Sequence, residues 1–261
     1  MIKEQNKEKG KKIKRMSIRD YILIQIVGQG VFGDVWLAEK KEKQQKEVAI
    51  KIYKKSTEKC KRYEKSLSLA KELIHPNLIK VHSYFVDRIN NGASSLAFIS
   101  VLEYVDGFNI GIIPDIETKM MGYIPQLKSL FDYLKDVGVV HRDIKPENIM
   151  VTVKDEKIKL IDYDFMKKES NELYNTVGTP LFCAPEVYSG KPFTHKSDLW
   201  SLGATLYFAL CKLHPFDAED HHSLKMLLLS DLPADFSPIS IPYVPLLSSL
   251  LNKDIDQRIF P

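Results

Sequence analysis

Residues 139–166 constrain the fold of this chain more than any other segment, because their pattern is that of a β-hairpin. Two short apolar runs, 149–153 and 158–161, have the β-branched composition of strands, and the charged residues 154–157 separate them as a turn would. The open ends of a hairpin lie together, since neighbouring strands are only ~5 Å apart. The side chains just outside this hairpin are therefore predicted to meet.

Four polar side chains stand at the open end of the predicted hairpin. Asn148 directly precedes the first strand, Asp162 directly follows the second, and Asp143 and Lys145 lie in the loop before Asn148. Carboxylate and amide oxygens suit Mg²⁺, and a nearby lysine suits the phosphates that this ion carries. The sequence therefore predicts a site for magnesium and phosphate. The alternative, a solvated charged loop, is disfavoured because Pro146 fixes the turn.

A glycine-rich loop is a second candidate for phosphate binding. Gly28, Gly30 and Gly33 follow the pattern G-x-G-x-x-G, and glycines allow backbone N–H groups to approach a phosphate. A dinucleotide-binding fold needs a helix after such a loop, whereas residues 35–38 (VWLA) favour a strand. We therefore expect a strand–loop–strand hairpin that closes over phosphates, and a plain glycine-rich turn is the alternative.

The rest of the chain reads as a β-rich part followed by a helix-rich part. Apolar and β-branched runs predict strands at 21–27, 35–38, 47–53 and 95–104, and helical spacing predicts helices at 56–74, 124–137 and 199–211. With 44% hydrophobic and 28% charged residues among 261, the composition is globular and excludes disordered and fibrous classes. Two lobes with a hinge near 103–107 are the simplest layout.

Several sequence features predict an intracellular, cytoplasmic location. The longest nearly apolar run, 202–211, is about half of the ~20 residues that a membrane span needs. The charged N-terminus lacks the apolar stretch of a signal peptide. The three cysteines offer neither a disulfide framework nor a zinc pattern, which fits a reducing compartment.

The formal net charge of +4 is concentrated at the N-terminus. Residues 1–15 hold seven basic and two acidic side chains, which leaves 31 of the 38 basic and 32 of the 34 acidic groups for residues 16–261. The nearly neutral body gives no reason to expect nucleic-acid binding. We expect residues 1–16 to form a basic disordered tail, and an arm that touches anionic membrane or nucleic acid is the alternative.

An ordered series of motifs resembles the eukaryotic-type serine/threonine protein kinases. After the glycine loop come V-A-I-K at 48–51, H-P-N at 75–77, H-R-D-I-K-P-E-N at 141–148, Asp162, G-T-P at 178–180, A-P-E at 184–186, D-L-W-S-L-G at 198–203 and Arg258. The resemblance implies an α+β, bilobal protein-kinase-like fold, with a β-rich N-lobe and a mainly helical C-lobe. Lys145 and Thr179 resemble the serine/threonine class rather than the tyrosine class.

The resemblance also implies domain limits. A protein kinase domain is expected at 17–261, with an N-lobe at about 17–103 and a C-lobe at about 108–261. The chain stops three residues after Arg258, so we expect the domain to be truncated before the family's last helix.

By the same resemblance, the chain would transfer the γ-phosphoryl group of ATP to protein hydroxyls with the help of Mg²⁺. Asp143 would accept the proton of the attacking hydroxyl, and Lys145 would steady the transferring group. Asn148 and Asp162 would hold the metal. The implied ATP-binding residues are Gly28, Gly30, Gly33, Val35, Ala49, Lys51, Met150 and the backbone of Glu103 and Val105.

Five further residues are expected to be structural or regulatory. Arg142 resembles the arginine through which family members sense a phosphate on the segment 162–186, and Thr176 is a candidate phosphorylation site there. Thr179 belongs to the same segment. Glu186 and Arg258 would form a structural ion pair.

Two positions depart from the family pattern. The glutamate expected ten residues before the H-P-N proline is Ser66, and Glu64 would face ~200° away on the same helix. Asp164 replaces the glycine of D-F-G, and we expect it to stiffen that segment. These changes are expected to slow a kinase, and Lys51 could pair with Asp162 instead. The alternative function is a nucleotide-binding pseudokinase that acts as a scaffold or allosteric regulator.

Overall fold

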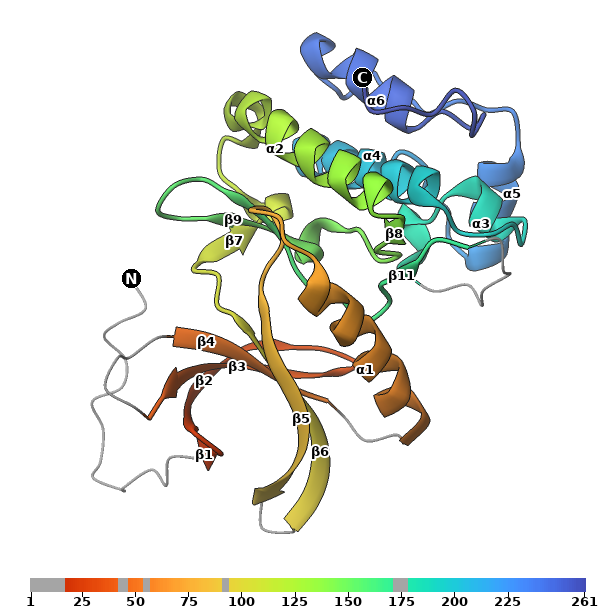
Figure 1. Cartoon of the computed structure of the whole chain (residues 1–261). Helices are drawn as coiled ribbons and strands as arrows, with labels where there is room; N and C mark the ends of the chain where they lie inside the picture. The colour runs from red at the N-terminus through yellow and green to blue at the C-terminus, as the bar shows by residue number, and fades with distance from the viewer. Residues whose placement is uncertain (1–16, 42–46, 54–56, 91–93, 171–177) are drawn as a thin grey trace. The chain divides into compact units, whose positions relative to one another are not determined.

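The computed structural model describes residues 17–41, 47–53, 57–90, 94–170 and 178–261, apart from a few side chains at element ends (Figure 1). The chain divides into two compact units. The first unit comprises residues 1–55 and 83–104, and the second comprises 56–82 and 105–261.

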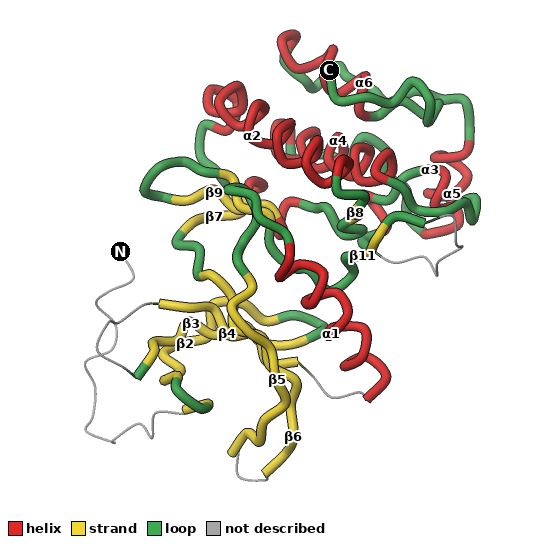
Figure 2. The backbone as a smooth tube through the Cα atoms, viewed as in Figure 1, coloured by secondary structure: helices red, strands yellow, loops and turns green. Residues whose placement is uncertain are grey.

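The first unit is built on a six-stranded sheet with the order β1-β2-β3-β4-β6-β5 (Figure 2). Successive pairs from β1 to β4, and β4 with β6, are antiparallel. Buried aliphatic side chains such as Ile50, Ile99 and Val101 alternate along these strands and form the core. The strands are β1 (Ser17–Ile18), β2 (Tyr21–Gln29), β3 (Gly33–Lys40), β4 (Glu47–Tyr53), β5 (Val81–Asn90) and β6 (Ser94–Glu103).

The second unit is mainly helical and contains two small sheets. Its longer helices are α1 (Thr57–Glu72), α2 (Ile116–Asp136), α4 (His195–Cys211) and α5 (His221–Leu229), and α3 (Pro185–Tyr188) and α6 (Val244–Leu250) are short. One sheet has the order β10-β9-β7 and the other pairs β11 with β8. These strands are β7 (Gly107–Asn109), β8 (Val139–Val140), β9 (Ile149–Thr152), β10 (Ile158–Leu160) and β11 (Lys167–Lys168).

Helix α4 forms the centre of the second unit and packs against α2 and α6 (Figure 1). A capping box begins the helix, because Thr194 and Ser197 exchange side-chain and backbone hydrogen bonds. Gly203 faces α6, and a Cβ at this position would lie 2.8 Å from Leu250 Cβ. A larger residue would therefore push the two helices apart.

Helix α1 belongs to the second unit, although the predicted N-lobe boundary at 103 would place it in the first. The residues that follow it, Leu78 and Ile79, explain this placement. Leu78 bridges to Leu160 of β10, and the Ile79 N–H donates to the Leu160 carbonyl at 3.2 Å. These backbone contacts tie the α1 region to the predicted hairpin.

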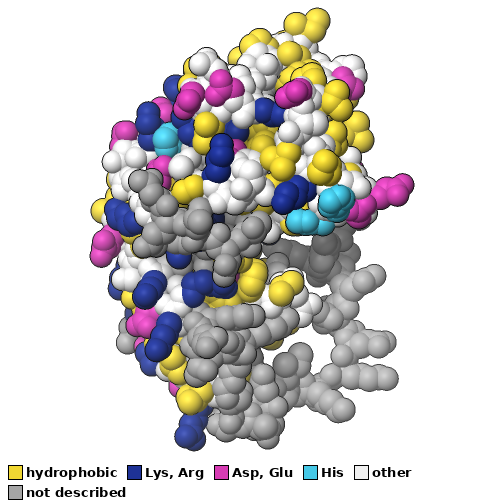
Figure 3. All heavy atoms as spheres, turned by 90° about the vertical axis from the view of Figure 1, so that its right-hand side faces the viewer, with side chains coloured by type: hydrophobic (Ala, Val, Ile, Leu, Met, Phe, Trp, Pro, Cys, Tyr) yellow, Lys and Arg dark blue, Asp and Glu magenta, His cyan; other side chains and the backbone are white. Residues whose placement is uncertain are grey.

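Helix α5 is buried on one side only. Leu224 and Leu228, four residues apart, face the interior, whereas Met226 and Leu229 are exposed. Figure 3 shows hydrophobic and histidine side chains on the face of the molecule where α5 lies. Across the described residues, no helix is both long enough and apolar enough to cross a membrane.

Candidate active site

The loop that carries Asp143 is anchored on α4 by Asp198. The two carboxylate oxygens of Asp198 accept the backbone N–H groups of His141 and Arg142, at 2.7 and 3.0 Å. Burial raises the pKa of Asp198 to about 7, although both hydrogen bonds lower it. Arg142 has a positive φ of 73°, which a non-glycine residue adopts only where its surroundings hold it. The beginning of the loop is therefore rigidly placed.

The imidazole of His141 links this loop to the end of β10. Its Nδ1 accepts the backbone N–H of Asp143 at 3.4 Å, and its Nε2 lies 3.2 Å from the Ile161 carbonyl. This pattern assigns the proton to Nε2 and keeps the ring neutral. Burial lowers the pKa of His141, which favours the same neutral form.

The side chains of Lys145, Thr179 and Asn148 converge on the buried carboxylate of Asp143. Lys145 Nζ forms an ion pair with Asp143 Oδ2 at 2.9 Å and donates to Thr179 Oγ1 at 3.1 Å. Thr179 Oγ1 in turn donates to Asp143 Oδ1 at 3.2 Å. Gly178 has φ +102°, and a Cβ there would lie 2.8 Å from the Arg142 carbonyl, so only glycine allows this close approach. The structure thus brings Asp143, Lys145 and Thr179 together.

Asn148 connects the same carboxylate with the hairpin of β9 and β10. Its Nδ2 donates to the Asp143 backbone carbonyl at 2.7 Å and to Asp143 Oδ2 at 3.1 Å. Its own carbonyl accepts the Ile161 N–H at 2.9 Å. Asp162 is the next residue, so the hairpin does bring the Asn148 and Asp162 regions together. The antiparallel pairing of β9 with β10 confirms the predicted hairpin.

The residues at the hairpin end fit a magnesium ion. Both N–H groups of the Asn148 amide are directed to Asp143, which leaves its Oδ1 for a cation. The backbone of Asp162 has a positive φ of 64°, and its side-chain Oδ1 accepts the backbone N–H of Asp164 at 3.3 Å. Among the described residues, no three or more His, Cys, Asp or Glu side chains are placed to hold a metal. Mg²⁺ is commonly bound by one or two protein side chains, and phosphate and water oxygens complete its ligands.

Tyr163 fixes the segment that follows β10. Its hydroxyl donates to the Ile79 carbonyl at 2.7 Å and lies 3.4 Å from the Leu160 carbonyl. Its ring also meets His141 edge-on, with ring centres 6.2 Å apart. Burying a hydroxyl group without a hydrogen-bond partner destabilises a protein, and burying one that has a partner avoids this cost. The segment Asp162-Tyr163-Asp164 is therefore held at its centre.

The two departures from the family pattern are in direct contact. Ser66 is buried on α1, and its Oγ donates to the Asp164 carbonyl at 3.3 Å and to the Arg62 carbonyl at 3.0 Å. Asp164 is also buried. Glu64 is exposed, as expected for a residue two positions from Ser66. Glu64 therefore does not take the place of the missing glutamate.

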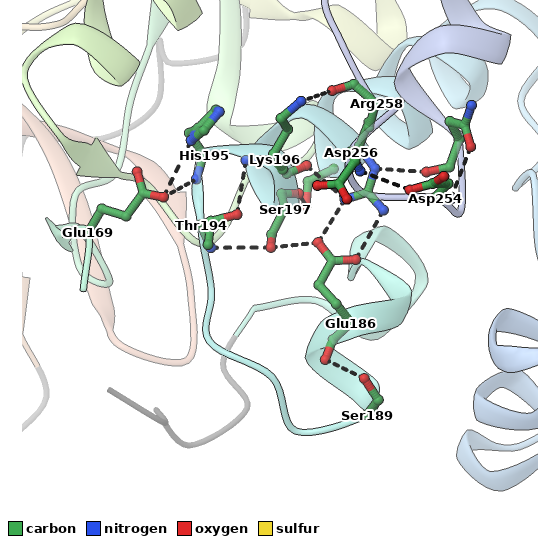
Figure 4. A network of polar contacts seen from close by, with 12 residues as sticks. Glu169, Glu186, Ser189, Thr194, His195, Lys196, Ser197, Asp254, Asp256 and Arg258 are labelled. Carbon is green, nitrogen blue, oxygen red and sulfur yellow. Dashed lines mark hydrogen bonds and ion pairs between the residues drawn. The ribbon is translucent and has the colours of Figure 1, made fainter. Parts of the chain in front are cut away.

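Glu186 and Arg258 form the expected ion pair, which Figure 4 shows at the centre of a wider network. Arg258 Nη1 and Nη2 donate to the two Glu186 oxygens at 2.7 and 3.0 Å. Ser197 Oγ donates to Glu186 Oε1 at 2.7 Å, and Lys196 Nζ donates to the Arg258 carbonyl. The pair therefore joins α3, the start of α4 and the C-terminal segment.

In the first unit, the glycine loop connects β2 with β3, as the strand–loop–strand prediction requires. The Gly30 N–H donates to the Gly33 carbonyl at 3.0 Å. A Cβ at Gly33 would lie 2.3 Å from the Ile52 carbonyl, so this position requires glycine. Lys51 is buried on β4, opposite Val35 of β3.

The remaining predicted residues are distributed over both units. Ala49 lies on β4 and Glu103 ends β6 in the first unit, whereas Val105 and Met150 lie in the second. Thr176 falls outside the described residues.

Two contributing residues were not assigned a role from the sequence. Asp198 opens the matched D-L-W-S-L-G motif, and this motif match is the signal that could have identified it as an anchor. The hydroxyl of Tyr163 gives no such signal, because its acceptor Ile79 is distant in the sequence.

Comparisons with known proteins agree with the motifs. The family model described as the protein kinase domain matches residues 21–260. A calcium/calmodulin-dependent protein kinase type 1 of Macrobrachium nipponense is 32% identical over 91% of this chain and 71% of its own length. The human serine/threonine-protein kinase Nek5 is 32% identical over 89% of the chain, which spans 33% of Nek5. The mouse serine/threonine-protein kinase 36 is 30% identical over 92% of the chain, which spans 18% of it.

Proposed function

The chain belongs to the protein kinase domain family, and we propose that it transfers the γ-phosphoryl group of ATP to serine and threonine hydroxyls of proteins in a magnesium-dependent reaction. The observation that carries this proposal is the convergence of Lys145, Thr179 and Asn148 on the Asp143 carboxylate. A carboxylate held at both oxygens is well placed to orient a hydroxyl and accept its proton.

Each residue at this centre has a proposed part in the reaction. Asp143 accepts the proton of the attacking hydroxyl, and Lys145, which already pairs with it, offers positive charge to the transferring group. The Thr179 hydroxyl bonds to both side chains and holds them beside each other. Asn148 and Asp162 would hold Mg²⁺, which supplies neutralising charge for the phosphates when bound.

The first unit contributes the proposed nucleotide contacts. Lys51 binds the α- and β-phosphates, and the loop of Gly28, Gly30 and Gly33 covers them with backbone N–H groups. The adenine contacts are Val35, Ala49, Met150 and the backbone of Glu103 and Val105. Positioning and charge neutralisation then account for the rate, since the enzyme forms no covalent intermediate.

Three regulatory and structural roles complete the proposal. Arg142 would sense a phosphate on the segment between Asp162 and Glu186, with Thr176 as a candidate acceptor. The Glu186–Arg258 pair is structural. A cytoplasmic location stays a prediction, as does membrane or nucleic-acid contact by the basic residues 1–16, which lie outside the described residues.

The rival proposal is a nucleotide-binding pseudokinase, which Ser66 and Asp164 favour because both depart from the family pattern. Radiolabelled ATP, a generic basic protein substrate and an Asp143→Ala control separate the two. If the chain is a kinase, the wild-type protein transfers label to the substrate and the Asp143→Ala variant does not. Equal label from both proteins would remove the kinase proposal. A rise in melting temperature with ATP, but no label, would support the pseudokinase.

A further inference from the structure

A cavity of about 310 Å³ lies in the second unit between helix α2, the start of α4 and the C-terminal segment. All of its lining residues belong to this one unit. Its volume equals that of ~10 water molecules at ~30 Å³ each. Sites for small molecules range from about 300 to 1,000 Å³, so the cavity has room for a small organic ligand.

Two lysines hold the walls of this cavity in place. Lys128 on α2 donates to the Phe260 carbonyl at 3.0 Å, and its Nζ lies 5.4 Å from the centre of the Phe260 ring. Lys196 on α4 donates to the Arg258 carbonyl, as Figure 4 shows. The C-terminal segment is therefore bonded to both helices, and the cavity that it closes has fixed walls.

The floor of the cavity is apolar. Phe131 and Leu134 of α2, Val139 of β8 and Leu199 of α4 are buried residues that line it. Ile259 lines it as well and is 51% exposed. An apolar group placed in the cavity would remove part of this exposed surface from water, which favours binding.

The charged part of the lining is more basic than acidic. It comprises two aspartates and three lysines, which are Asp132, Asp198, Lys128, Lys135 and Lys196. Asp132 pairs with Lys128 at 3.6 Å, and both oxygens of Asp198 accept backbone N–H groups of the neighbouring loop. Among the described residues, Lys135 and Lys196 form no ion pair with a carboxylate. Two positive charges at the cavity are therefore not balanced by acids.

The other two polar groups to consider do not change this balance. His195 also lines the cavity, and its Nδ1 lies 3.3 Å from Glu169 Oε1, so that any positive charge on the ring has its own acid. Burial raises the pKa of Asp198 to about 7, which reduces its negative charge at neutral pH. The cavity therefore favours a negatively charged ligand.

We propose that this cavity binds a small organic anion, with an apolar body on the floor and a carboxylate beside Lys135 and Lys196. Hydrogen bonds between an ammonium group and a carboxylate are among the stronger ones in proteins. A cationic ligand would meet two like charges, and a neutral one would gain no charge-assisted bond. The inference goes beyond the proposed function, because no lining residue has a proposed contact with ATP or with the protein substrate.

Octanoate, an apolar chain with one carboxylate, is a suitable test ligand. In protein with isotope-labelled isoleucine methyl groups, we expect octanoate to shift the NMR signal of the Ile259 methyl group saturably, with a Kd of about 1 mM or below. Octanol and octylamine keep the chain and change the charge, and both should bind at least about fivefold more weakly. No saturable shift with octanoate, or equally tight binding of octanol or octylamine, would overturn the proposal.

Variants on helix α2 test the charges in both directions. Lys135→Gln removes a positive charge and should weaken octanoate binding about threefold to fivefold, whereas Asp132→Asn removes a negative charge and should strengthen it about twofold. Both positions are exposed, so the variants should melt close to the wild-type temperature. Lys119→Gln, on the same helix but outside the cavity, is the matched control and should leave the Kd unchanged. Equal weakening by Lys135→Gln and Lys119→Gln, or weaker binding by Asp132→Asn, would contradict the proposal.

These measurements need neither ATP nor a protein substrate, so they are independent of the kinase assay. A protein that binds octanoate as expected but does not label substrate would contradict the kinase proposal and support the cavity proposal. A protein that labels substrate but does not bind octanoate would contradict the cavity proposal alone.

Discussion

Thr179 Oγ1 donates a hydrogen bond to Asp143 Oδ1 at 3.2 Å, while Lys145 donates to the same hydroxyl. A residue 36 positions away in the sequence therefore sets the orientation of the proposed catalytic carboxylate. The Thr179 hydroxyl bonds to both Asp143 and Lys145, so it sets the distance between these two side chains.

We expect Thr179→Val to lower kcat by up to about 30-fold, because one hydrogen bond of ~1 kcal/mol is lost at each of the two partners. Thr179→Ser keeps the hydroxyl and should retain most of the activity. The KM for ATP should change little, because Thr179 has no proposed contact with the nucleotide. Steady-state kinetics on the three proteins checks this, and equal kcat values for the valine and serine variants would contradict the role.

The ion pair between Glu186 and Arg258 should stabilise the second unit strongly. Arg258→Met leaves the buried Glu186 carboxylate without its cation, and we expect the free energy of unfolding to fall by about 3–5 kcal/mol. The double variant Glu186→Gln with Arg258→Met should lose less than the sum of the single changes. Urea unfolding measures these differences, and a loss below about 1 kcal/mol for Arg258→Met would argue against the pair.

The Tyr163 hydroxyl should contribute to stability rather than to chemistry. Tyr163→Phe leaves the buried Ile79 carbonyl without this donor, and we expect a loss of about 1–2 kcal/mol in the free energy of unfolding. The rate of phosphate transfer at a temperature well below unfolding should change less than in Thr179→Val. A Tyr163→Phe protein as stable as the wild type would show that the hydrogen bond is of no consequence.

The buried Asp198 predicts a specific pH dependence of stability. Its pKa is raised from 3.8 to about 7, so between these values the folded chain holds a proton at this site that the unfolded chain has released. The contribution of this carboxyl group to the free energy of unfolding therefore falls as pH rises from about 4 to about 7. The stability difference between wild type and Asp198→Asn should shrink over this range in urea titrations. A difference that grows with pH would contradict the assignment.

The hairpin at the centre of the site could be predicted from the sequence because it is local. Both strands and the turn lie within residues 149–161, and the observed β9 and β10 differ from the prediction by one residue each. The polar residues at its open end therefore followed from strand spacing alone.

Elements that depend on distant partners were harder to predict. Strand β5 (Val81–Asn90) was not predicted, because its polar residues interrupt the apolar pattern and its place at the edge of the sheet depends on β6. Helix α2 begins at Ile116 rather than at 124. Its apolar stripe runs through Met120 and Tyr123, ahead of Pro125, which the packed helix accommodates in its interior.

Contacts between segments far apart in the sequence explain what the motifs did not reveal. The resemblance named Asp143, Lys145 and Thr179 and matched Asp198 in a motif, but it did not predict that the Thr179 hydroxyl bonds to both Asp143 and Lys145 or that Asp198 anchors the loop. Nor does the sequence predict that Ser66 and Asp164 meet, because 98 positions separate them.

Transfer of the γ-phosphate from ATP to serine and threonine, measured while magnesium is titrated, tests the central claim most directly. We predict label on substrate hydroxyls that rises with magnesium and falls at least about 100-fold in Asp143→Asn, which retains the size of the side chain. Wild-type protein that leaves the substrate unlabelled at every magnesium concentration, or that labels it no better than Asp143→Asn does, would contradict the account.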